Sequence, residues 1–197
     1  EDIDLYMKMV EKGSLPVRVY AMLGGSNRKL TNYFVREPLI GYGDRRLTFR
    51  ALKVYSDGAL GSRGAALLAP YSDDPGNWGI STTDGDQLED LTRQALKRGF
   101  QVCVHAIGDR ANAIILDLFK EVAEKNGPRD RRFRIEHSQH LRPDDIKRFG
   151  AQKVIASMQP YHCADDGRWC NKRIGPERSK GTYAFRTLLD SGAVLAF

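Results

Sequence analysis

The sequence predicts an α/β fold that forms part of a (β/α)8 barrel. Apolar residues repeat alternately with a spacing of two and of about 3.6, which is typical of strands and helices that follow one another. Lys53, His105 and His137 each lie near the C-terminal end of a different expected strand, where barrel enzymes assemble their active sites. No G-x-G-x-x-G motif follows the first strand. These observations favour the barrel over the alternative, an open doubly wound sheet.

Six segments have the period-two pattern of strands. They span residues 16–23, 47–57, 100–106, 133–139, 154–159 and 193–197. Because helical patterns separate most of them, we expect a parallel sheet covered by helices.

The expected helices span residues 86–98, 109–126, 143–149 and 181–191. In the second helix one apolar face is expected to contain Ile114, Ile115, Leu118, Phe119 and Val122. Gly150 is expected to end the third helix. Residues 57–83, rich in Gly, Ala, Asp and Ser, are expected to form a long loop, and loops of this length are often functional.

Composition and charge exclude several classes of protein. The chain has 197 residues, of which 41% are hydrophobic and 28% charged, as in ordinary globular domains. The net charge of +6 comes from short scattered clusters and not from a single basic stripe, so we expect no nucleic-acid partner. No apolar run approaches the roughly 20 residues that span a bilayer, so we expect no membrane partner. Three cysteines cannot all pair with one another, which favours reduced thiols and a cytoplasmic location.

Two histidines and one lysine are candidates for chemistry. A single histidine in a strand is more often a buried structural residue than a ligand. His105 and His137, however, end neighbouring parallel strands, whose ends converge on one opening of a barrel. Lys53 lies within an apolar strand, where an edge position would explain it simply, and a Schiff base or a carbamylated metal ligand would explain it functionally. The residues alone therefore indicate a metal-dependent or lysine-dependent barrel enzyme.

Five motifs in a fixed order give the chain a family resemblance. They are KVYSDGALGSRGAAL at 53–67, HAIGDRA at 105–111, IEHSQ at 135–139, SMQPYH at 157–162 and YAFRTLL at 183–189. With them the chain resembles the amidohydrolase superfamily, specifically the branch similar to N-substituted formamide deformylases, amidohydrolase family 3. The resemblance extends over nearly the whole chain.

The resemblance implies a (β/α)8 barrel in which Lys53, His105, His137 and Gln159 end strands four to seven. It implies one or two divalent metal ions, commonly zinc, held by Lys53, His105 and His137, with Lys53 often carbamylated. The other ligands would be an HxH pair on the first strand and an aspartate on the eighth, which acts as general base. The chemistry would be the attack of metal-activated water on a carbonyl carbon.

The sequence departs from this family pattern at both ends. No HxH motif precedes residue 16, and the chain stops at Phe197, before the expected aspartate. The 197 residues are also fewer than the roughly 250 of a complete barrel. We therefore expect residues 1–197 to form a single incomplete barrel domain, from about strand three to strand eight. This fragment is expected to retain no general base and to be inactive by itself.

The expected reaction is hydrolysis of a C–N bond in a small-molecule amide or formamide. Asp57, Gln159 and His162 follow strand ends and are the expected substrate-binding residues. Two alternatives stay open: hydrolysis of another ester, lactone or cyclic amide, and a non-catalytic amidohydrolase-like scaffold. An incomplete barrel exposes unpaired sheet edges, so we expect the fragment to be either unstable alone or stabilised by self-association into a homo-oligomer.

Overall fold

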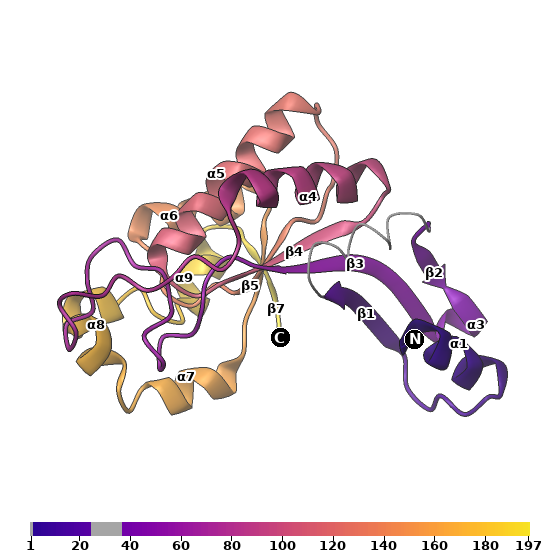
Figure 1. Ribbon diagram of the computed structural model, residues 1–197, viewed down its shortest axis with the longest axis horizontal. Coiled ribbons are helices and arrows are strands. Elements are labelled where there is room, and N and C mark those ends of the chain that lie inside the picture. Colours follow the sequence, from indigo (N-terminus) through magenta and orange to yellow (C-terminus); the bar gives the residue numbers. More distant parts are fainter. Residues whose placement is uncertain (1, 25–36) are drawn as a thin grey trace. The chain divides into compact units, whose positions relative to one another are not determined.

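The computed structural model describes residues 2–24 and 37–197, which form two compact units. The first unit contains Glu1–Lys53 and Asp90–Val102, and the second contains Val54–Glu89 and Cys103–Phe197. The class is mixed α/β, with parallel strands connected by helices, as the sequence predicts (Figure 1).

The first unit is built around a parallel pair of strands. β1 (Val19–Gly24) pairs with β3 (Leu47–Tyr55) from Val19 opposite Leu47 to Gly24 opposite Lys53. The short β2 (Leu39–Gly41) pairs antiparallel with β3. The sequence indicated neither β2 nor the helices α1 (Asp2–Glu11) and α3 (Tyr42–Arg45). A three-residue strand is too short to show an alternating pattern, and α1 buries none of its residues.

The second unit contains four strands that pair in parallel in the order of the chain. They are β4 (Gln101–Ala106, which begins in the first unit), β5 (Arg134–His137), β6 (Ile155–Ser157) and β7 (Val194–Ala196). All six residues of β4 are buried, as expected for a parallel strand covered on both faces. The strands expected from 100–106, 133–139, 154–159 and 193–197 are thereby confirmed.

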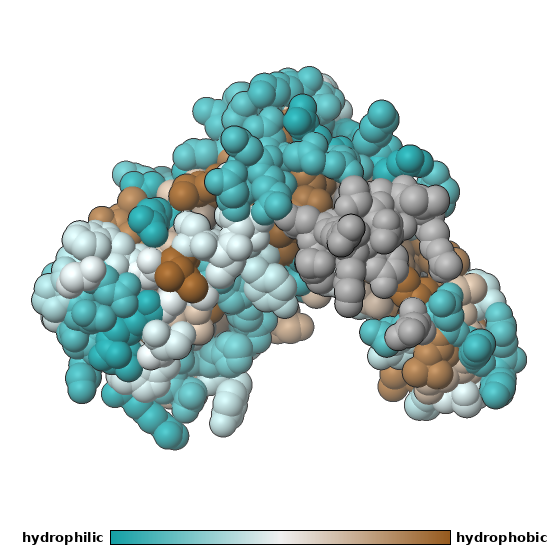
Figure 2. Space-filling model, viewed as in Figure 1, coloured by the Kyte–Doolittle hydropathy of each residue, from teal (hydrophilic) through white to brown (hydrophobic). Residues whose placement is uncertain are grey.

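Helices connect these strands. They are α5 (Asp109–Lys125), α6 (Pro143–Gln152), α7 (Pro160–Asp166), α8 (Cys170–Ser179) and α9 (Phe185–Asp190). A further helix, α4 (Gly85–Lys97), precedes β4, and most of it belongs to the first unit. Most of the surface seen in Figure 2 is hydrophilic, because amphipathic helices turn their apolar faces toward the sheet. Among the described residues, none of the helices combines the length and the apolar character needed to cross a membrane.

Two expectations about helices were wrong. Gly150 does not end α6, which continues to Gln152 and is closed by Lys153 in a left-handed conformation. A Cβ on Gly150 would lie 1.8 Å from the carbonyl oxygen of Ser191, so this glycine permits a close approach of two backbones. Ile114 is 44% exposed, since Ile115, Leu118 and its neighbours already fill the buried face of α5.

The loop expected at 57–83 is present and contains neither helix nor strand. The helix expected at 181–191 is shorter, because Thr182 forms a bridge with His140 before α9 begins. The sequence did not indicate α7 or α8. Within α8, Gly175 and Pro176 interrupt the helical geometry, so the segment has no helical pattern to detect.

Candidate metal centre

The second unit brings His105 and His137 together. His105 is the fifth residue of β4 and His137 the last of β5, and in the register Ala106 lies opposite His137. The centroids of the two imidazole rings are 4.6 Å apart, with the planes at 68°. The contact arises because parallel neighbouring strands place their carboxyl ends side by side.

The backbone at His137 departs from the strand conformation. His137 has φ 76° and Ser138 has φ 45°, both in the left-handed region that non-glycine residues seldom occupy. The Ser138 hydroxyl donates to the carbonyl oxygen of Ile135 and closes the turn at 3.1 Å. Such conformations occur preferentially at functional sites, where the surrounding structure maintains them.

Gln159 and His162 both lie against His137. Gln159 precedes α7, and its Oε1 is 2.7 Å from Nδ1 of His137. His162, in the first turn of α7, stacks on the His137 ring with centroids 5.9 Å apart. Both predicted substrate-binding residues are therefore beside a predicted metal ligand, and their binding of substrate stays a prediction.

Asp57 is buried next to the ring of His105. The residue is 2% exposed, and its carboxylate accepts hydrogen bonds from the backbone N–H groups of Ala66, Ile107 and Gly108 at 2.9, 3.0 and 2.8 Å. Oδ1 is 3.4 Å from Nε2 of His105. Burial raises the pKa of Asp57 to about 6, while the three N–H donors favour its charged form.

Ser56, the residue directly after β3, holds the backbone of His105. The carbonyl oxygen of His105 accepts hydrogen bonds from the backbone N–H of Ser56 at 3.0 Å and from its hydroxyl at 2.5 Å. The Tyr55 ring lies 5.4 Å from the His105 ring. Sequence reasoning missed Ser56, although its place between β3 and Asp57 is the signal that could have identified it.

Lys53 belongs to the first unit. It is half-buried near the end of β3 and lies opposite Gly24 of β1. Its role as a metal ligand stays a prediction.

The histidines fit part of a metal site. Imidazole nitrogen is a preferred ligand of zinc, and structural or catalytic zinc takes at least three protein ligands. Within residues 2–24 and 37–197, no cluster of three or more His, Cys, Asp or Glu side chains could hold a metal ion. A complete site would therefore need ligands in addition to His105 and His137.

His140 belongs to a different environment from the other histidines. It is buried, and its Nδ1 lies 2.7 Å from the hydroxyl of Thr182. Burial, with a smaller effect of Arg178, lowers the pKa of His140 to about 3 and keeps it neutral. The His140 ring thus contacts the Thr182 hydroxyl and, at 3.1 Å, the side-chain amide of Gln139.

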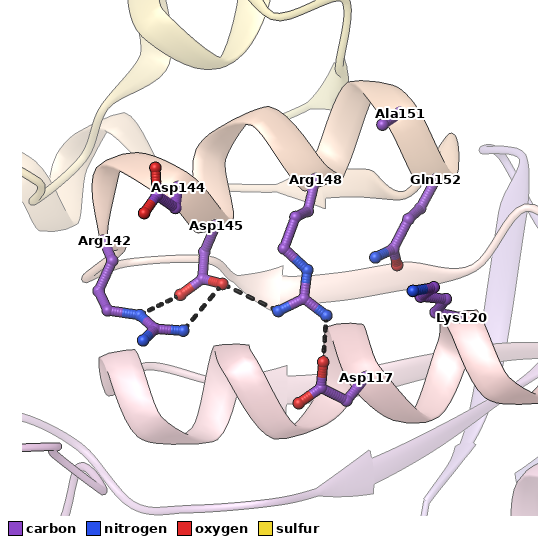
Figure 3. Close-up of a pocket in the computed structure, with 8 residues that line it drawn as sticks. All are labelled: Asp117, Lys120, Arg142, Asp144, Asp145, Arg148, Ala151 and Gln152. Carbon is purple, nitrogen blue, oxygen red and sulfur yellow. Dashed lines mark hydrogen bonds and ion pairs between the residues drawn. The ribbon is translucent and has the colours of Figure 1, made fainter.

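A pocket of the second unit lies between α5 and α6 (Figure 3), and no histidine lines it. Arg148 joins the two helices there, with one nitrogen on Asp117 and another on Asp145. Arg142 also contacts Asp145, so the charges of this pocket are largely paired with one another.

Comparison with known proteins gave one family and several relatives. The family described as "Amidohydrolase family" (amidohydrolase family 3) matches residues 1–197. The chain is 47% identical to Protein LONG AFTER FAR-RED 3 of Arabidopsis thaliana over 146 residues, covering 74% of this chain and 25% of that protein. It is 34% identical to the putative amidohydrolase YtcJ of Bacillus subtilis, covering 99% of this chain and 36% of that protein.

A solved structure is similar over almost the whole chain. It is an uncharacterized metal-dependent hydrolase from Pyrococcus furiosus, with a TM-score of 0.85 and 32% identity. The match covers 98% of this chain and 39% of that structure. The chain thus spans between a quarter and two fifths of the length of these relatives.

Proposed function

Because this chain belongs to amidohydrolase family 3, we propose that it is part of a metal-dependent hydrolase that cleaves the C–N bond of a small amide or formamide. The observation that carries the proposal is the contact of His105 with His137 at the ends of neighbouring parallel strands. The metal-dependent hydrolase of similar structure supports the assignment.

In this proposal His105 and His137 contribute to a divalent metal site that takes its remaining ligands from elsewhere in the protein, zinc being the preferred ion. When bound, such an ion polarises a carbonyl group and makes water acidic enough to react near neutral pH. The neighbouring side chains restrict the orientation of the two imidazole rings. Asp57 contacts the ring of His105, and Gln159 contacts the ring of His137. We assign no general base within residues 1–197.

Gln159 and His162 are the proposed contacts of the substrate amide. Both lie at the start of α7, and His162 is exposed beside His137. An amide side chain can donate to the substrate carbonyl and accept from its N–H group, which suits the recognition of an amide bond.

The test uses the full-length protein. Metal analysis is expected to give about one or two zinc-like ions per chain, and a panel of amides, formamides and esters to give metal-dependent hydrolysis of a C–N bond. His137→Asn is expected to lower metal content and activity, whereas the control His140→Asn, in the same motif, keeps the metal. A protein without metal would contradict the enzyme assignment and favour a scaffold, and hydrolysis of esters or lactones alone would contradict the C–N assignment.

A further inference from the structure

We propose that Asp57 is a positioning residue that fixes the tautomer and orientation of His105. This deepens the proposed function, in which His105 is a metal ligand, and it replaces the expected contact of Asp57 with substrate. Asp57 directly follows β3, and its carboxylate connects two other segments of the second unit. These are the long loop, which contains Ala66, and the connection from β4 to α5, which contains Ile107 and Gly108.

The hydrogen bonds of Asp57 occupy both carboxylate oxygens. Oδ2 accepts from Ala66 and Gly108, and Oδ1 accepts from Ile107 and faces His105. With 2% of its surface exposed, the residue has almost no surface for a small molecule to contact. A carboxylate so surrounded acts on its neighbours, not directly on substrate.

The contacts of His105 determine where its proton lies. Nε2 is 3.4 Å from Oδ1 of Asp57 and 3.5 Å from the carbonyl oxygen of Gly58. Both oxygens are acceptors, so an Nε2 without hydrogen would place its lone pair against theirs. Neutral His105 therefore carries its proton on Nε2 and its lone pair on Nδ1, the atom that is then the donor to a metal ion.

Close backbone packing keeps Asp57 at this position. A Cβ on Gly108 would lie 1.9 Å from the carbonyl oxygen of Ala66, so the segments that contain Ala66 and Gly108 approach as closely as glycine allows. The N–H groups of both residues meet on one carboxylate oxygen. Together with the hydrogen bonds from Ser56 to the His105 backbone, these contacts fix both the ring and the main chain of the ligand.

The test begins with the tautomer itself. In full-length protein labelled with 15N-histidine, freed of metal and held at pH 8, long-range 1H–15N spectra distinguish the two neutral tautomers. We expect His105 to be protonated at Nε2, and protonation at Nδ1 would overturn the proposal. This measurement needs no variant, so it decides even if Asp57 variants do not fold.

Asp57→Asn reverses the electrostatics on one side. The amide oxygen is expected to remain opposite Ala66 and Gly108, which turns the NH2 group toward Nε2 of His105 and favours a proton on Nδ1. The NH2 group then also faces the backbone N–H of Ile107, which loses its acceptor. Loss of such a partner typically weakens metal affinity about 10- to 100-fold. We expect this loss for Zn2+, measured by competition with a chelator.

Asp109→Asn is the matched control. Asp109 also joins the long loop to the start of α5, through hydrogen bonds from Leu68 and Arg110, both 2.9 Å, and neither of these involves His105. In Asp109→Asn, the tautomer of His105 and the affinity for Zn2+ are expected to equal those of the wild-type protein. Equal effects of both variants, or none in Asp57→Asn, would overturn the proposal. The predicted tautomer in a protein that neither binds Zn2+ nor hydrolyses amides would refute the proposed function and leave the positioning role in place.

Discussion

Gly108→Ala should strongly destabilise the protein, although it adds only one methyl group. The φ of Gly108 is −72°, which alanine adopts easily, so backbone strain contributes nothing. The new Cβ would lie 1.9 Å from the carbonyl oxygen of Ala66, whereas real Cβ contacts stay above 3.0 Å, so one backbone must move by about 1.1 Å.

That movement also separates Asp57 from its donors. The carboxylate holds Ala66 at 2.9 Å and Gly108 at 2.8 Å, and a shift of this size breaks one of the two hydrogen bonds. A hydrogen bond to a charged group contributes about 1.5–3 kcal/mol, and overpacking costs about 1–3 kcal/mol. We therefore expect the free energy of unfolding to fall by about 2.5–6 kcal/mol.

Urea unfolding followed by circular dichroism measures this loss, with Gly85→Ala as the matched control. Gly85 is the first residue of α4, and a Cβ added to it would meet no atom within 4 Å. The control should be neutral or stabilising by up to about 1 kcal/mol. A loss below about 1 kcal/mol in Gly108→Ala, or an equal loss in both variants, would refute the steric reasoning.

Three further predictions concern stability. The pKa of His140 is lowered from 6.5 to about 3 in the folded state, so its contribution to the free energy of unfolding is fully present above pH 6.5 and is lost toward pH 3, by up to about 1.4 kcal/mol per pH unit. The free energy of unfolding measured against pH should therefore change less steeply in His140→Asn, and an unchanged slope would contradict the burial of a neutral His140. Asp145→Ala should cost about 2–3 kcal/mol in urea unfolding because this carboxylate, 1% exposed, holds two arginines, whereas the 92% exposed Asp144→Ala should change little. Phe119→Ala should cost about 3–5 kcal/mol in the same assay and Ile114→Ala, on the exposed side of α5, less than about 1 kcal/mol, and similar values for the two would refute the packing.

The elements with a strong local pattern could be predicted from the sequence. β4 is a continuous run of buried residues, and α5 repeats its apolar residues at helical spacing over four turns. Segments whose conformation depends on distant partners could not. In the sequence Gly150 indicates the end of a helix, but in the structure it permits the close approach of the Ser191 backbone, 41 residues later in the chain.

The candidate site divides in the same way. The sequence by itself determined that His105 and His137 meet, because each ends a strand and adjacent parallel strands align their ends. Only the tertiary structure decided that Asp57 faces His105 and not the solvent, since its partners are 9 to 51 residues away along the chain. Strand ends follow from local periodicity, whereas the environment of a buried carboxylate depends on which loops fold against it, and that has no local pattern.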